Sequence, residues 1–124
     1  MTGTVSIINQ IPSVDLIPAV RERHEAGWRL VQISCARIDD TYELTYSFDK
    51  DLGMEHLRVI IGLDEPIVSI SCIYLAAFVY ENEIADLYGI NIQGIAIDYK
   101  GKFIKTSILH PFKGTVTVKK GEAE

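Results

Sequence analysis

The sequence predicts an α+β fold in which a small, mostly antiparallel sheet of about four strands is flanked by two helices and followed by an extended basic C-terminal arm. Polar and apolar side chains alternate through the middle of the chain, helical spacing occurs on both sides of that region, and lysines gather near the C-terminus. With 124 residues, 48% of them apolar and 23% charged, the chain is expected to fold as one domain with one core.

The first predicted elements are a short apolar run over 5–8 and a helix. A Pro-Ser pair introduces the helix, which we expect to be capped by Ser13 or Asp15. The helix is predicted to continue to about Ala26, because Gly27 stands where a helix commonly ends with a glycine. Its apolar side chains lie on one side only, at Leu16, Ala19 and Val20.

Four strands are predicted after this helix. Residues 28–38 and 42–48 alternate as half-buried strands do, and an Asp-Asp turn between them predicts a hairpin. Residues 56–61 alternate in the same way and form a third strand. After Pro66, we expect a fourth short strand over 67–70. The sheet therefore lies between the two helices in the sequence.

Charge divides the chain into two parts. Residues 1–98 hold 15 acidic and 6 basic side chains, whereas residues 99–121 hold six lysines and no acidic side chain. This asymmetry predicts an α/β domain over 1–98 and a lysine-rich arm over 99–124. The overall net charge of −5 argues against a general nucleic-acid binder, which needs a surplus of lysine and arginine.

The sequence indicates a cytoplasmic protein that does not itself cross a membrane. No secretory signal is visible at the N-terminus, and the least charged stretch, 66–80, is shorter than the roughly 20 residues of a spanning helix. Cys35 and Cys72 both have apolar neighbours, so each is expected to be a small core side chain rather than part of a disulfide scaffold.

A second helix is predicted over 74–88, and Gly89 follows in the position of a helix-ending glycine. It carries the densest polar cluster of the chain, in which Glu83 and Asp86 are three residues apart and can share a face. Together with Glu81, these carboxylates could hold a hard metal ion or serve as acid and base. The interpretation we favour is a partly buried cluster that accepts hydrogen bonds and fixes how a loop docks.

Other signatures of catalysis or cofactor binding are missing from the sequence. It contains no Gly-rich phosphate loop, no GxSxG motif and no CxxC pair for zinc or an iron-sulfur cluster. The three histidines are too scattered in the sequence to predict a ligand set: His24, His56 and His110. We therefore expect no catalytic residue, no cofactor and no metal in this chain.

The lysine-rich arm contains apolar side chains between its lysines, which a solvated tail would not need. We expect these side chains to be covered by the acidic body of the same chain or by a partner subunit. A second possibility is that the arm binds nucleic acid or an anionic membrane surface, and such binding would weaken steeply as salt is raised.

Residues 81–90 resemble a family signature. They read Glu-Asn-Glu-Ile-Ala-Asp-Leu-Tyr-Gly-Ile, which is similar to the Glu-Arg-Glu-x-x-Asp-x-Phe/Tyr-Gly-Ile/Val of the 30-kDa subunit family of respiratory complex I. The resemblance covers roughly 5–112, and the length is similar to the short form in energy-converting, membrane-bound [NiFe] hydrogenases. Asn82 stands where the family usually has arginine. Residues 93–96 replace the Gly-His-Pro-Asp of quinone-reducing members, which favours the hydrogenase branch.

The resemblance implies a domain without a cofactor that docks against two neighbours, a large [NiFe]-hydrogenase-like (49-kDa-like) subunit and a small iron-sulfur subunit, with its arm across one of them. The docking residues carried over by position are Glu81, Glu83, Asp86, Tyr88, Gly89 and Ile90, and those expected in the arm are Phe103 and Phe112.

These observations lead to one hypothesis and one main alternative. The hypothesis is a non-catalytic structural subunit of a membrane-associated, hydrogenase-like or complex I-like oxidoreductase, peripheral on the inner face of the cell membrane through its complex. The alternative is a free-standing small enzyme or metal-binding protein that uses Glu81, Glu83 and Asp86.

Overall fold

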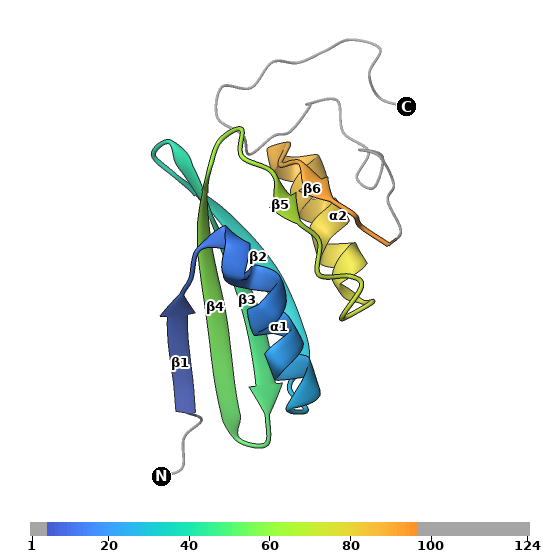
Figure 1. Ribbon diagram of the computed structural model, residues 1–124. Helices are drawn as coiled ribbons and strands as arrows, with labels where there is room; N and C mark the ends of the chain where they lie inside the picture. The colour runs from blue at the N-terminus through green and yellow to red at the C-terminus, as the bar shows by residue number, and fades with distance from the viewer. Residues whose placement is uncertain (1–4, 97–124) are drawn as a thin grey trace.

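The computed structural model describes residues 5–96, in which two helices pack on one face of a four-stranded sheet (Figure 1). A short 3-10 turn over Ser13–Asp15 precedes the first helix. The helices and strands are β1 (Val5–Gln10), α1 (Leu16–Glu25), β2 (Arg29–Ile38), β3 (Thr41–Lys50), β4 (Gly53–Gly62), β5 (Ile67–Val68), α2 (Ala77–Tyr88) and β6 (Ile92–Gln93).

The sheet has the strand order β1-β4-β3-β2. The pairs β2–β3 and β3–β4 are antiparallel, and β1 runs parallel to β4, so the predicted α+β class with a mostly antiparallel sheet is confirmed. The identity of the fourth strand differs from the prediction. The N-terminal run is the fourth strand, because it occupies the free edge of β4, while β5 pairs with β6 in a separate two-stranded sheet.

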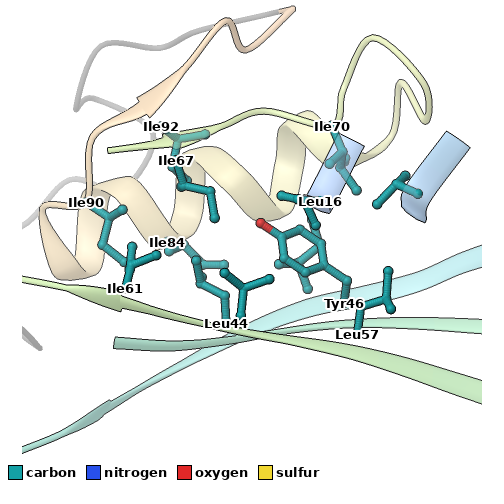
Figure 2. Packing of buried hydrophobic residues seen from close by; sticks show 14 of the residues in the cluster. Leu16, Leu44, Tyr46, Leu57, Ile61, Ile67, Ile70, Ile84, Ile90 and Ile92 are labelled. Carbon is teal, nitrogen blue, oxygen red and sulfur yellow. The ribbon is translucent and has the colours of Figure 1, made fainter. Parts of the chain in front are cut away.

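The core lies between the sheet and the two helices, as Figure 2 shows for a part of it. In β3 every second side chain is buried, from Tyr42 to Phe48, which is the predicted alternation. The sheet residues meet one buried face of each helix. The helical members of the core are Leu16, Val20, Ala77 and Ile84.

A bulge interrupts the alternation of β2. Leu30 pairs with Phe48, but the next pair joins Gln32 to Ser47, so Val31 is the extra residue. As a result, Leu30 and Ile33 both pack on the core, whereas Val31 is exposed. The uninterrupted alternation that was predicted over 28–38, with Val31 on the side of Ile33, is wrong at this point.

The ends of α1 agree with the sequence in part. Neither Ser13 nor Asp15 caps the helix with its side chain, because the 3-10 turn leads directly into the helix and the Ser13 hydroxyl donates to Glu65 instead, at 3.2 Å. Gly27, with φ +90°, follows the last turn as predicted. The prediction of two core cysteines is wrong for Cys72, which is exposed, while Cys35 is half-buried.

The predicted domain boundary at residue 98 lies outside the described residues, which end at Ala96. The lysine-rich arm over 99–124, with Phe103 and Phe112, is outside the residues that the structure describes. Within residues 5–96, no helix is long and apolar enough to cross a membrane.

Candidate functional site

The polar cluster predicted on the second helix lies on α2, and its members have very different exposures. Glu81 is only 1% exposed, and Asn82 and Asp86 are also buried, whereas Glu83 is exposed to solvent. The 3.6-residue period explains this division, because positions 81 and 83 point to different sides of a helix. The candidate site therefore has an internal part and an external part.

Glu81 holds the segment before α2 through both of its carboxylate oxygens. Its Oε1 accepts a hydrogen bond from the Ser69 hydroxyl at 2.6 Å, and its Oε2 accepts one from the Ile70 N–H at 2.8 Å. This segment follows β5 and carries Ile70 into the core. A buried carboxylate with two such donors fixes the segment against the helix.

Two serines extend this network to the last described residues. The Ser69 and Ser71 hydroxyl oxygens lie 2.7 Å apart, and the Ser71 Oγ accepts the Ala96 N–H at 2.7 Å. Because the single Ser69 hydrogen is donated to an ionised Glu81, the Ser71 hydroxyl must donate to Ser69. The chain of hydrogen bonds thus runs from Ala96 through both serines to Glu81.

Burial raises the pKa of the Glu81 carboxyl above its ordinary value, and the hydrogen bonds from Ser69 and Ile70 oppose this rise. Tyr46, also buried beneath α2, has a raised phenol pKa because of burial and, to a smaller degree, because of the negative charge of Glu81. A protonated Glu81 can donate its hydrogen to the Ser69 Oγ only if the Ser69 hydroxyl turns away from Glu81, and the Ser71 Oγ then lies within reach as its acceptor.

Tyrosines on and near α2 cover the outer edge of β2. The Tyr88 hydroxyl donates to the Cys35 carbonyl oxygen at 2.8 Å, and the Tyr80 hydroxyl donates to that of Val31 at 3.0 Å. Just before the helix, the Tyr74 hydroxyl donates to the carbonyl oxygen of Trp28, the residue preceding β2, at 2.7 Å. Carbonyl oxygens of an edge strand, which would otherwise be open to another strand, are thereby occupied.

The end of the signature joins α2 to the sheet. Gly89 ends α2 with φ +76°, in the left-handed region that glycine adopts without strain, as predicted from the sequence. The ring of Tyr88 lies edge-on against that of Tyr42, with 5.7 Å between centroids, and the Tyr42 hydroxyl donates to the Tyr88 carbonyl oxygen at 3.1 Å. Ile90 follows in the core.

Glu83 belongs to an exposed stripe that includes apolar side chains. Leu75, Val79 and Glu83 follow one another at four-residue spacing along α2 and the turn before it, and Leu75 and Val79 are 60% and 40% exposed. We call these three residues the α2 stripe. Apolar side chains of this size at the surface, next to a charged one, have the composition of a protein-binding surface.

The geometry of the carboxylates does not favour a metal site. Within residues 5–96, no group of three or more histidine, cysteine, aspartate or glutamate side chains is arranged to hold a metal ion. Glu81 uses both oxygens inside the domain, and Glu83 is exposed on another side of the helix. Asn82, which replaces the family's arginine, donates to the Phe78 carbonyl oxygen of the same helix at 2.8 Å.

Sequence reasoning identified the helix that carries the site but missed the residues that bind to it. Ser69, which donates to Glu81, and Ser71, which bonds to Ser69, were not predicted, although two serines two residues apart beside a buried strand are a visible signal. The roles of Tyr74 and Tyr80 were also missed. A tyrosine hydroxyl reaches across an element, so spacing along one helix does not reveal its partner.

The comparisons with known proteins agree with the signature. A family model of the respiratory-chain NADH dehydrogenase 30 kDa subunit matches residues 9–120. The match includes the whole signature on α2 and most of the chain. The chain therefore belongs to this family. No curated protein sequence matches it.

The fold is similar to a solved structure of the membrane-bound sulfane sulfur reductase, an archaeal respiratory membrane complex. The TM-score is 0.74 at 20% sequence identity, over 93% of this chain and 70% of that chain. At this identity the likeness establishes a shared fold.

Proposed function

We propose that this chain, a member of the 30 kDa subunit family, is a non-catalytic structural subunit of a membrane-associated oxidoreductase complex of the hydrogenase-like or complex I-like type. The family match supports a place in a multisubunit oxidoreductase, and the structural neighbour comes from a respiratory membrane complex. The proposed neighbours are a large [NiFe]-hydrogenase-like (49-kDa-like) subunit and a small iron-sulfur subunit. Through them, the chain lies on the cytoplasmic side, at the inner face of the membrane.

One observation carries this proposal, namely the division of the signature between the inside and the outside of the domain. Glu81 binds Ser69 and Ile70 inside, while Glu83 lies outside on the α2 stripe. An interior carboxylate that fixes a helix and an exposed stripe on the same helix suit a docking element. They do not suit an acid–base pair, whose members must reach one reacting group.

The proposed docking residues then act in two ways. Glu83 contacts a neighbouring subunit directly as part of the α2 stripe. The other docking residues hold the helix in position from within: Glu81 and Tyr88 through hydrogen bonds inside the domain, Gly89 through the turn that ends the helix, and Ile90 through the core. Asp86 is buried on the same helix and is proposed to act with them. In the arm, Phe103 and Phe112 are proposed to contact a neighbouring subunit.

The proposed contribution of this chain is to hold the neighbouring subunits in a fixed relative position. Electron transfer and its coupling to ion movement depend on how the redox-carrying subunits are placed relative to one another. A domain whose docking helix is tied to β2 by tyrosines and to the segment after β5 by Glu81 changes shape little when it is bound. Such a domain can hold two neighbours in one relative orientation.

The test is assembly of the complex in cells that make it. Leu75→Asp and Val79→Asp place a charge on the α2 stripe, and each is expected to reduce recovery of the complex with the tagged chain at least tenfold. Val14→Asp is the matched control, because Val14 is 82% exposed in the turn before α1 and is not part of the stripe. Equal recovery of all three variants would contradict the docking role of α2.

The alternative function is tested with the purified chain alone. Metal analysis and a turnover assay of the full chain separate a structural subunit from a small metalloenzyme. A stoichiometric metal that is lost in Glu81→Gln and Asp86→Asn variants, or intrinsic turnover, would reject the structural role.

A further inference from the structure

The two edges of the sheet are treated differently, and the edge formed by β1 has no partner within residues 5–96. β1 pairs with β4 on one side, and no described strand pairs with its other side. Figure 1 shows β1 at one side of the sheet and α2 at the other. The tyrosines that cover β2 therefore have no counterpart at β1 among the described residues.

The hydrogen bonds of β1 show which of its backbone groups face outward. The Ile11 N–H, directly after the strand, donates to the Arg58 carbonyl oxygen of β4 at 2.9 Å. In a parallel pair the N–H and C=O of one residue point to the same neighbour, and successive residues point to opposite sides. The backbone groups of Asn9 thus face β4, whereas those of Ile8 and Gln10 face away from the sheet.

Two neighbouring side chains in the middle of this edge strand are large, apolar and about half exposed. Ile7 is 45% and Ile8 54% exposed, and the register places Ile7 beside Glu55 on the helix side and Ile8 beside His56 on the open face of the sheet. No charged residue and no proline occurs in β1. Proteins that keep an edge strand free usually protect it with such residues or with a bulge.

We propose that the outer edge of β1 accepts a β-strand from another subunit, so that the sheet continues across the interface. This inference rests on the proposed function, because the proposed complex supplies the partner subunit. The partner segment is extended, presents its backbone to Ile8 and Gln10, and carries uncharged, apolar side chains beside Ile7 and Ile8. This surface lies at the opposite edge of the sheet from α2, so one domain can bind two neighbours.

Charge favours another subunit over a second copy of this chain. The whole chain carries 17 acidic and 12 basic side chains, a net charge of −5, so two copies of it repel each other overall. A neutral or basic neighbour does not meet this repulsion. Main-chain pairing then provides the affinity, and the absence of charge at β1 allows it.

Proline substitutions separate the two sides of β1. Ile8→Pro removes an outward N–H and leaves the bonds to β4, whereas Ile7→Pro removes an N–H that faces β4. Ile8→Ala keeps the outward N–H and removes only the side chain. We expect Ile8→Pro to reduce recovery of the assembled complex at least tenfold, Ile8→Ala to reduce it less than threefold, and Ile8→Pro to unfold at nearly the wild-type midpoint.

Amide hydrogen exchange of residues 5–10, measured in the wild-type chain alone and in the purified complex, keeps the test independent of any variant's folding. We expect the amides of Ile8 and Gln10 to exchange at least tenfold more slowly in the complex than in the isolated full-length monomer. Equal exchange in a complex that contains the chain would overturn this proposal and leave the proposed function standing.

The other possible results of these experiments also test the proposed strand pairing at β1. Absence of the chain from the complex rejects the proposed function and this proposal with it. Slow exchange in the isolated chain together with a dimer mass in sedimentation assigns the edge to a second copy and overturns the proposal. Slow exchange in an isolated monomer assigns the edge to another part of the same chain, which overturns it as well.

Discussion

At one edge of the sheet the carbonyl oxygens of β2 accept tyrosine hydroxyls from α2, whereas at the other edge β1 presents its backbone groups without a described partner. Both are edge strands of one sheet in one small domain. The covered edge is the one against which α2 is fixed, and the edge left open among the described residues is the one where a neighbour is proposed to bind.

The covered edge depends on the interior of α2 as much as on its tyrosines. α2 stays beside β2 because Glu81 binds the segment after β5, because Ile84 reaches the core and because Tyr88 binds Cys35. Among residues 5–96, β1 is held in the sheet by its pairing with β4. Substitutions on the two sides should therefore differ in their effects on stability, and this difference can be measured.

The largest effect is expected from Glu81→Ala. The substitution leaves the Ser69 hydroxyl and the Ile70 N–H without their acceptor and opens a cavity, so we expect a loss of about 2–4 kcal/mol in the free energy of unfolding. Urea denaturation measures it. Glu83→Ala on the same helix is the matched control and should change the free energy by less than about 0.5 kcal/mol, because Glu83 is exposed. Similar losses in both variants would contradict the internal role of Glu81.

The next effect comes from removing single hydroxyls at the covered edge. Tyr88→Phe and Tyr74→Phe should each reduce the free energy of unfolding by about 1 kcal/mol, because each leaves a partly buried carbonyl oxygen without its hydrogen-bond donor. Tyr80→Phe should cost less, since its bond to Val31 is exposed to water. Urea denaturation measures each loss, and the triple variant tests whether the three bonds act independently. We expect its loss to be roughly the sum of the three single losses, and a much smaller loss would show that these carbonyl oxygens are satisfied by other means.

Much of the fold could be predicted because alternation and helical spacing report burial directly. The run from Tyr42 to Phe48 was assigned correctly, since each buried side chain lies two residues from the next. The bulge at Val31 could not be predicted, because an extra residue in a strand changes pairing without changing composition. The parallel pairing of β1 with β4 was also missed, since a non-local partner leaves no local pattern.

The sequence located the segment that carries the site, but not how the side chains of that segment are arranged. The signature located Glu81 and Gly89 on the right helix and at its end. Which of the carboxylates is buried depends on how the helix is rotated against the sheet, and that depends on packing with β2 and with the segment of Ser69 and Ile70. Spacing along one helix does not reveal these contacts, because the partners of Glu81 lie in another segment of the chain.

A smaller effect concerns the pH dependence of stability. The pKa of Glu81 is raised in the folded protein by burial, so between its unfolded value near 4.5 and the raised value the unfolded chain releases a proton that the folded chain keeps. Glu81 therefore makes the protein less stable as pH rises through this window. At the lower end of this pH window, Glu81→Gln should reduce the free energy of unfolding by less than about 1 kcal/mol, because the amide can take the place of the protonated carboxyl.

The cost of Glu81→Gln should then shrink as pH rises, and unfolding curves of both proteins at several pH values measure this change. A cost that grows with pH would mean that the ionised carboxylate is the form stabilised by folding. The hydrogen bonds from Ser69 and the Ile70 N–H would then outweigh burial and lower the pKa of Glu81 instead of leaving it raised.

The smallest effect is expected at the open edge and tests whether it is open. Ile8→Thr keeps a β-branched side chain on β1, so strand propensity is preserved and only apolar contact is lost. Because Ile8 is half exposed in the described domain, the isolated chain should lose less than about 0.5 kcal/mol of unfolding free energy. A loss above about 1 kcal/mol would require Ile8 to be buried in the isolated chain, and the contrast between the covered and the open edge would then hold only for residues 5–96.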